Sequence, residues 1–123
     1  MGLDIHFFSG EKTKKCADRD IEMGYFRKVN PLLYWIDRNV QSVDNCKEVL
    51  IPKHKLEELL ADLNRLTKEN CIQVYPTADG FFYGSIQYDQ DYWSDVERVK
   101  NWINSLLKSF DFNKYNLFLW AWW

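Results

Sequence analysis

The sequence lacks two features that would place it in a broad class at once, a long apolar segment and an excess of charge of one sign. Its longest apolar runs fall far short of the ~18 residues that a membrane-spanning helix requires. Sixteen Lys and Arg stand against eighteen Asp and Glu, which gives a net charge of -2 at pH 7. We therefore expect no membrane span and no bulk binding of nucleic acid, because polyanion binding relies on surplus basic side chains.

Cysteine and histidine are both scarce. The three cysteines match neither a disulfide framework nor a C-x-x-C zinc motif, and they are Cys16, Cys46 and Cys71. Neither His6 nor His54 lies at a helical spacing from a cysteine. This pattern favours ordinary buried thiols in a reducing compartment over a metal site, and we expect no cofactor. Because Asp4 stands where a signal peptide would be apolar, we expect a cytoplasmic location.

The motifs of common enzyme classes are also missing. The sequence contains no Walker A motif, no G-x-G-x-x-G, no H-E-x-x-H and no G-x-S-x-G. Catalytic activity is therefore less expected than binding. Three carboxylates do gather near a predicted helix start, namely Asp89, Asp91 and Asp95. A Mg²⁺ site is one interpretation, but we favour acidic side chains that cap the helix and oppose the positive end of its dipole.

Aromatic residues are what the sequence has in abundance. Six Trp, seven Tyr and eight Phe make up 17% of its 123 residues. At about 200 Å² each, these side chains supply less area than a chain of this length buries on folding, so an aromatic core accounts for them. The 46% hydrophobic and 28% charged fractions argue against disorder. We expect one globular domain over residues 1–123.

Apolar periodicity predicts strands and helices that alternate loosely along the chain. Strands are predicted at residues 2–8, 47–51, 71–75, 81–85 and 114–123, the third and fourth forming a hairpin. Helices are predicted to begin at Asn30–Pro31, at Pro52 and at Asp89 or Asp91, the last two ending near Lys68 and Ser109. Residues 11–20 read as a solvated loop. This order predicts an α+β, two-layer domain with a mixed sheet and about three helices packed on one face.

Polar and cationic side chains crowd the segment between Gly24 and Pro31, where the sequence has Tyr25, Arg27, Lys28 and Asn30. Arg27 can hold a carboxylate or phosphate through two N–H groups while an aromatic ring lines the same pocket. His6 would be the natural acid or base to join it, with Asp4 on the same face of a strand. A surface arginine beside a half-buried tyrosine and a structural histidine is the plainer interpretation.

Short motifs along the chain resemble a group of small phage and bacterial proteins without an assigned activity. The matching pieces are Met1-Gly2-Leu3-Asp4, Gly24-Tyr25-Phe26-Arg27-Lys28-x-Asn30, Trp35, Asn39-Val40-Gln41, Asp44-Asn45-Cys46, and Pro76-Thr77-x-x-Gly80-Phe81-Phe82-Tyr83-Gly84-Ser85 followed by Tyr88-Asp89. The chain departs from the group at Phe26, where the group has Trp, and at its Trp-rich end. The resemblance implies a site and no reaction. The candidate ligand-binding residues are Tyr25, Arg27, Lys28, Asn30, Cys46, Gly84, Ser85 and Tyr88.

These features together lead us to expect a small binding or protein-interaction module of phage or mobile-element origin. Its partner would be another protein or a second copy of the chain. Tryptophan is enriched at the centres of protein interfaces, and the candidate interface residues are Trp93, Trp102, Trp120, Trp122 and Trp123. Membrane attachment through residues 117–123 is a weaker interpretation, because an aromatic end is better explained as a packed strand.

The alternative is a small enzyme, or a protein that binds a nucleotide or another small ligand in one pocket around Tyr25, Arg27, Asn30 and Cys46. This hypothesis requires the matching segments to meet in space. If Arg27 and residues 44–46 lie more than about 10 Å from residues 80–85, they are beyond hydrogen-bond reach of a common ligand and the single pocket fails.

Overall fold

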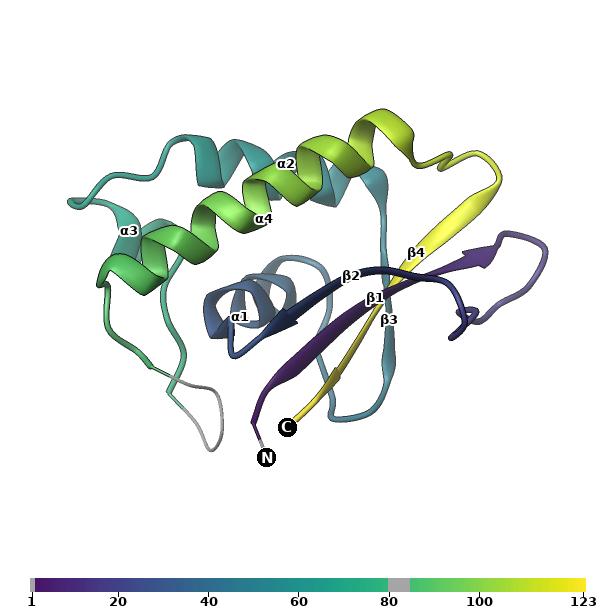
Figure 1. The fold of residues 1–123 in the computed structure, drawn as a ribbon, viewed down its shortest axis with the longest axis horizontal. Coiled ribbons are helices and arrows are strands. Elements are labelled where there is room, and N and C mark those ends of the chain that lie inside the picture. The colour runs from purple at the N-terminus through teal and green to yellow at the C-terminus, as the bar shows by residue number, and fades with distance from the viewer. Residues whose placement is uncertain (1, 80–84) are drawn as a thin grey trace.

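The computed structural model of the protein describes residues 2–79 and 85–123. The chain forms a four-stranded sheet with helices packed on one face (Figure 1), which confirms the predicted α+β architecture. In chain order the elements are β1 (Asp4–Glu11), β2 (Glu22–Arg27), α1 (Asn30–Asn39), β3 (Glu48–Ile51), α2 (Lys53–Asn64), α3 (Cys71–Val74), α4 (Gln90–Ser109) and β4 (Tyr115–Trp122). Within the described ranges, none of the helices combines the length and the apolar character needed to cross a bilayer.

The strand order is β2-β1-β4-β3, and each neighbouring pair is antiparallel. The prediction of a mixed sheet is therefore wrong in this detail. Residues 12–21 alone join β1 to β2, which is too short for the helical crossover that neighbouring parallel strands need. β4 then enters between β1 and β3 and runs opposite to both.

Strand alternation gives the sheet one buried and one open face. Ile5 and Phe7 of β1 and Leu119 of β4 are fully buried against the helices, and the residues between them point to the open face. β1 continues to Glu11, beyond its predicted end at residue 8. The sequence did not predict β2, because Phe26 is its only fully buried residue and the strand shows no regular alternation.

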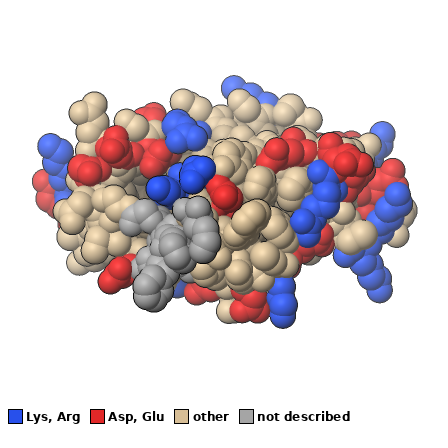
Figure 2. All heavy atoms as spheres, turned by 60° about the horizontal axis from the view of Figure 1, so that its bottom comes forward, with Lys and Arg blue, Asp and Glu red and all other residues tan. Residues whose placement is uncertain are grey.

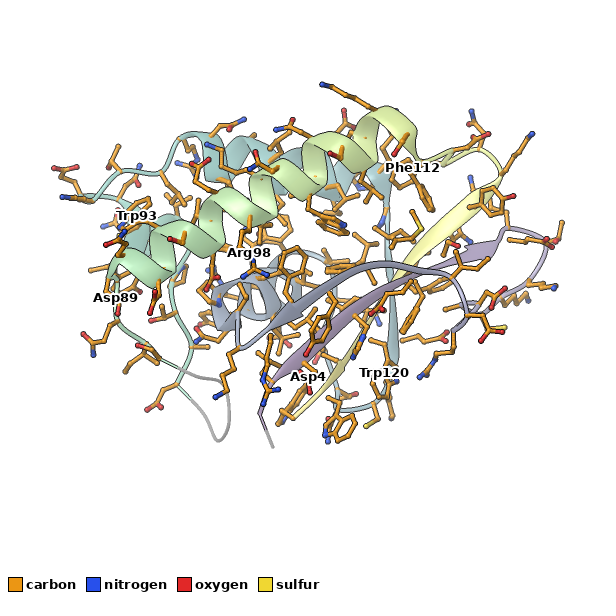
Figure 3. The ribbon with its side chains drawn as sticks, in the orientation of Figure 1. Asp4, Asp89, Trp93, Arg98, Phe112 and Trp120 are labelled. Carbon is orange, nitrogen blue, oxygen red and sulfur yellow. The ribbon has the colours of Figure 1, made fainter. Side chains whose placement is uncertain are left out.

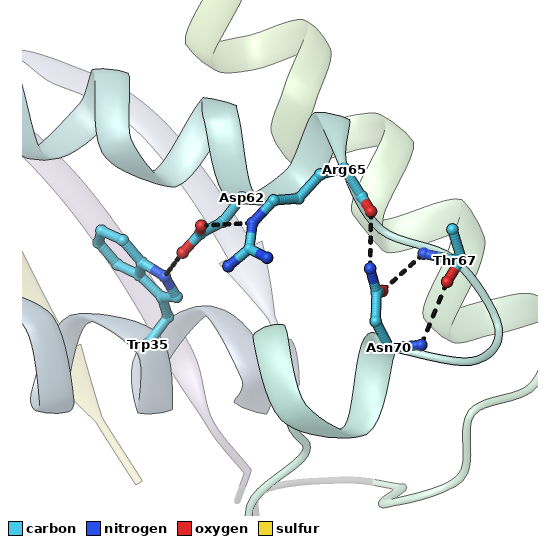
Figure 4. A network of polar contacts seen from close by, with 5 residues as sticks. All are labelled: Trp35, Asp62, Arg65, Thr67 and Asn70. Carbon is cyan, nitrogen blue, oxygen red and sulfur yellow. Dashed lines mark hydrogen bonds and ion pairs between the residues drawn. The ribbon is translucent and has the colours of Figure 1, made fainter.

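α1 begins at Asn30 and Pro31, as predicted, because proline suits a first turn whose N–H groups have no partner within the helix. Trp35 in this helix is only 2% exposed. Its Nε1–H donates to Asp62 Oδ2 of α2 at 2.8 Å (Figure 4). This hydrogen bond satisfies the single polar group of a large buried side chain and fixes α1 against α2.

Residues 71–75, predicted to form a strand, instead contain the short helix α3. Thr67 N donates to Asn70 Oδ1 at 2.7 Å, and Asn70 N donates to Thr67 Oγ1 at 3.1 Å (Figure 4). These reciprocal bonds close a tight turn, and the carbonyl of Thr67 accepts Cys71 N–H at 3.0 Å, which starts the helix. α2 consequently ends at Asn64, before its predicted end. Apart from Ser85, which is not in a strand, the other half of the predicted hairpin lies outside the described residues.

α4 begins after its cap Asp89, whose carboxylate accepts the backbone N–H of Tyr92 at 3.2 Å. The helix buries one apolar face, which consists of Tyr92, Val96, Val99, Ile103 and Leu106, with Leu107 and Phe110 partly buried beside it. Trp102 reaches β2 and donates Nε1–H to the carbonyl of Met23 at 2.8 Å. An added Cβ at Gly24 would lie 2.6 Å from Trp102 Nε1, so the contact requires glycine at that position.

Candidate functional site

The open face of the sheet carries four neighbouring rings from three strands, which we call the aromatic patch: His6, Tyr25, Trp120 and Trp122. The His6 ring centroid lies 4.8 Å from that of Tyr25 and 5.9 Å from that of Trp120. The two tryptophan rings are 6.4 Å apart. The strand register accounts for this group, because Tyr25, His6 and Trp120 are direct neighbours across β2, β1 and β4.

The segment between β1 and β2 covers one end of the open face. Phe8 and Phe118 point to this face, yet they are only 7% and 6% exposed. Arg19 places its guanidinium 4.5 Å from the centroid of the Trp120 ring. Gly10 allows the segment to cross, because an added Cβ would lie 2.4 Å from a carbonyl oxygen of that segment. The expected solvated loop is thus folded partly onto the sheet, and the aromatic patch lies beside it.

Two polar groups of the aromatic patch are paired within the chain. Tyr25 donates its hydroxyl to Asp4 Oδ1, and His6 Nδ1 lies 2.6 Å from Glu22 Oε1. The hydrogen bond to Asp4 raises the pKa of Tyr25 above its ordinary value, so the phenol stays protonated. Figure 3 shows Asp4 and Trp120 on the side of the sheet away from α2 and α4. The Tyr25 hydroxyl and His6 Nδ1 therefore already have partners, whereas the buried Nε1 of Trp120 has none among the described residues.

A pocket of about 420 Å³ opens where the end of β2, the start of α1 and the first turns of α4 meet. We call it the α1–α4 pocket. Its lining includes the polar and charged residues Arg27, Lys28, Asn30, Tyr75, Asp95 and Arg98. Asn30 is 1% exposed and holds one wall, because its Nδ2 donates to Ser85 O at 2.8 Å and its Oδ1 accepts Ala78 N–H at 2.9 Å.

The α1–α4 pocket is bordered by equal numbers of basic and acidic residues, namely Arg27, Lys28 and Arg98 against Asp89, Asp91 and Asp95. Arg98 Nη1 lies 2.9 Å from Asp95 Oδ1. Figure 3 shows Arg98 extending from α4 toward β2, with Asp89 at the start of the helix. Burial raises the pKa of the Asp95 carboxyl above its ordinary value, although Arg98 acts in the opposite direction. The ionised carboxylate of Asp95 is therefore held at a cost to folding.

Tyr75, which follows α3, lines the same pocket and is 1% exposed. Among the described residues its hydroxyl has no hydrogen-bond partner, whereas buried hydroxyls nearly always have one. Burial raises the pKa of this hydroxyl well above its ordinary value, and Tyr92 and Asp95 raise it further. The Tyr75 ring lies beside that of Tyr92, with centroids 6.0 Å apart, and both residues line the pocket.

The predicted ligand-binding residues are divided between several places. Arg27, Lys28, Asn30 and Ser85 line the α1–α4 pocket. Tyr88 lies next to its wall, where the hydroxyl oxygen accepts the backbone N–H of Thr77 at 3.0 Å. Gly84 lies outside the described residues.

Tyr25 and Cys46 are not among the residues that line this pocket, although Arg27, which does, is close enough to Tyr25 to lower its pKa. Tyr25 belongs to the aromatic patch. Cys46 donates its backbone N–H to Ala121 O of β4 at 2.8 Å, on the side of β4 that faces β3. Arg27 ends β2 at the opposite edge of the sheet, so β1 and β4 lie between them. The structure does not bring Cys46 and Arg27 into one pocket.

Two of the five predicted interface tryptophans, Trp120 and Trp122, belong to the aromatic patch. Trp102 is held against β2 by its bond to Met23. The Trp93 ring packs edge-on against Tyr92 with centroids 5.1 Å apart. Trp123 packs against the core. These three therefore contribute to the structure of the domain.

Sequence reasoning missed the roles of Tyr75 and Arg98. A signal existed for Arg98, because it follows Asp95 by three residues and this spacing puts both on one face of a helix. No signal existed for Tyr75, because the lack of a partner for its hydroxyl is a result of tertiary packing. Among the described residues, no group of three or more His, Cys, Asp and Glu is arranged to hold a metal ion.

The aromatic patch and the α1–α4 pocket are thus the two features from which a function can be argued. Comparison of the chain with protein-family models, with curated proteins and with solved structures finds no match.

Proposed function

We propose that this protein is an interaction module that pairs with a second copy of itself through the aromatic patch. The observation that carries the proposal is the contiguity of the four rings, of which Tyr25 is 43% and Trp122 is 49% exposed. Tryptophan and tyrosine dominate the centres of protein interfaces because each buries a large apolar area. The core cluster of the domain lies on the other face of the sheet, so its packing does not require these exposed rings.

The polar groups beside the rings support the proposal because they keep the cost of covering the patch low. The Tyr25 hydroxyl is bonded to Asp4, and His6 is bonded to Glu22. A partner that covers the Tyr25 hydroxyl and His6 Nδ1 therefore leaves neither of these two atoms without a hydrogen bond. An unpaired charge at the same place would oppose association.

The charges around the aromatic patch favour a second copy as the partner. Arg19 and Arg27 flank it together with the acidic Asp4 and Glu22. A two-fold contact sets the patch against itself in reversed orientation, so that acidic groups can face basic ones. The net charge of -2 per copy gives little repulsion. Figure 2 shows a face on which Lys and Arg side chains are interspersed with Asp and Glu, without a large area of one sign.

Sedimentation velocity on the purified chain tests the pairing. A contact limited to one sheet face belongs to the small class of interfaces, so we expect a dissociation constant of about 10–100 µM. The protein should therefore change from monomer to dimer between about 5 and about 300 µM. Trp122→Ala and Tyr25→Ala should each weaken pairing by about 30-fold, because they remove exposed anchors.

Ile72→Ala is the matched control, because Ile72 is 62% exposed but lies on α3, away from the patch. This control should dimerise like the unaltered chain. A chain that stays monomeric throughout the concentration range would contradict the proposal. So would a dimer that Trp122→Ala and Ile72→Ala leave equally intact, since its interface would then lie elsewhere.

The phage or mobile-element origin and the cytoplasmic location stay predictions. Both are consistent with a small pairing module that has no catalytic motif. A second candidate function, the binding of a small ligand, is favoured by the unpartnered Tyr75 hydroxyl in the α1–α4 pocket.

A further inference from the structure

We propose that the α1–α4 pocket binds a small zwitterionic molecule, of the class of a free α-amino acid, with its carboxylate at Arg27 and Lys28 and its ammonium group at Asp95. The pocket lies beside the aromatic patch, with Arg27 at the border of both, and the proposal does not depend on pairing of the chain. Its volume of about 420 Å³ falls within the range of small-molecule pockets.

The basic side of the pocket is suited to a carboxylate. Neither Arg27 nor Lys28 has an ion-pair partner within 4.0 Å among the residues that the structure describes. Both stand directly before α1, whose first turn contains no acidic residue and receives no side-chain cap. The positive end of the α1 dipole and the two cations therefore act on the same part of the pocket. A carboxylate placed there would be attracted by both.

The acidic side of the pocket is suited to a hydrogen-bond donor that carries positive charge. Asp95 is partly buried, and its one ion pair with a described residue is to Arg98 at 2.9 Å. A cationic ligand group beside Asp95 would offset the cost of keeping this carboxylate ionised.

The buried Tyr75 hydroxyl is the independent observation that points to a ligand. It has no hydrogen-bond partner among the described residues, in a side chain that is 1% exposed and lines this pocket. The hydroxyl can accept a proton from an ammonium group or donate one to a carboxylate. A bound polar molecule would satisfy it, and an apolar molecule would not.

The balance of charge selects a zwitterion over a simple anion. Three basic and three acidic residues border the pocket, so its formal charge is zero. A multiply charged phosphate at Arg27 and Lys28 would also meet the carboxylates of Asp89, Asp91 and Asp95. A molecule with one charge of each sign pairs with both sides.

Amide chemical shifts of the ¹⁵N-labelled chain test the proposal. The probes are the coded L-α-amino acids, each added alone, together with inorganic phosphate. For any amino acid that binds, two further probes are its analogue without the carboxylate and its analogue without the amine. We expect at least one amino acid to shift the amides of Lys28, Asn30 and Asp95, and each analogue to bind at least about tenfold more weakly.

Three variants assign the binding to this pocket. Lys28→Ala removes a cation, Asp95→Asn removes an anion and Tyr75→Phe removes the hydroxyl. Each should weaken binding of the amino acid by about tenfold. The matched controls are Lys47→Ala and Tyr115→Phe, which remove the same groups from exposed positions outside this pocket, and these should leave binding unchanged. Thermal unfolding of each variant separates lost binding from lost folding.

Several results would overturn the proposal. One is that no amino acid shifts the amides around the pocket. Another is that phosphate, or the analogue without the amine, binds as tightly as the amino acid. Equal binding by Tyr75→Phe and the unaltered chain would remove the hydroxyl from the site. The chain is kept at about 5 µM in a parallel calorimetric titration, below the concentration at which pairing is expected, so failure here and failure of the pairing are distinguishable.

Discussion

At the scale of single residues, two buried polar side chains beside the α1–α4 pocket behave in opposite ways. Asn30 uses its amide nitrogen and oxygen to hold Ser85 and Ala78, so its burial at 1% exposure is compensated by hydrogen bonds. Tyr75 is equally buried, and its hydroxyl has no partner among the described residues. Asn30 therefore stabilises the fold, whereas the hydroxyl of Tyr75 opposes it.

Tyr75→Phe should make the ligand-free chain more stable by about 1 kcal/mol, because it leaves the ring in place and removes a buried hydroxyl that forms no hydrogen bond with any described residue. Urea denaturation followed by circular dichroism measures the difference. Tyr115→Phe, at a position 36% exposed, is the control and should leave stability unchanged. A loss of stability in Tyr75→Phe would mean that the hydroxyl is satisfied in solution.

Asp95 gives a pH-dependent expectation with a definite sign. Burial raises the pKa of its carboxyl in the folded chain. Folding therefore favours the protonated carboxyl of Asp95. The stability that this carboxyl contributes is fully present below its pKa in the unfolded chain, and it is lost as the pH rises through its pKa in the folded chain. Asp95→Asn should therefore raise the melting temperature at pH 7, with a smaller difference at about pH 3. A larger gain at acidic pH would contradict this cause.

At the scale of elements, the contact between α4 and β2 depends on one glycine. Trp102 fills the space above Gly24, where an added Cβ would lie 2.6 Å from its Nε1. The indole also donates to Met23 and packs with its ring centroid 4.4 Å from that of Phe7. The ring cannot move far without losing these contacts.

Gly24→Ala should destabilise the chain by about 1–3 kcal/mol, because the methyl group overpacks against a fixed ring. In a Trp102→Leu background the same substitution should cost much less, since the clashing atoms are gone. Urea denaturation of the two single variants and the double variant measures this coupling. Additive effects would show that Trp102 is not what limits the size of residue 24.

At the scale of the whole molecule, the two faces of the sheet have different roles. One face forms the core with the helices, and the other carries the aromatic patch next to the covering segment 12–21. Pairing through the open face would place two sheets against each other while all helices stay on the outside. Because acidic and basic groups balance around the patch, we expect a change from about 0.05 to about 0.5 M salt to alter the pairing constant little. A pairing constant that falls steeply with salt would point to a charged interface instead.

The sequence by itself determined the elements whose signals are local. Alternation marked β1, the aromatic residues of the last ten positions marked β4, the Asn30-Pro31 pair marked the start of α1, and the apolar spacing after Asp89 marked α4. It also directed attention to Arg27, Lys28, Asn30 and Ser85, which the structure brings into one pocket. These predictions are correct because hydrophobic periodicity and helix capping depend on residues that are close together in the sequence.

Only the tertiary structure decided the rest. The all-antiparallel strand order, the helical state of residues 71–74 and the position of Cys46 beside β4 depend on contacts between distant segments. The same holds for the lack of a partner for the Tyr75 hydroxyl among the described residues and for the separation of Tyr25 from Asn30 into two different sites. Burial and pairing across the chain are properties of the packed molecule, so residue pattern alone does not contain them.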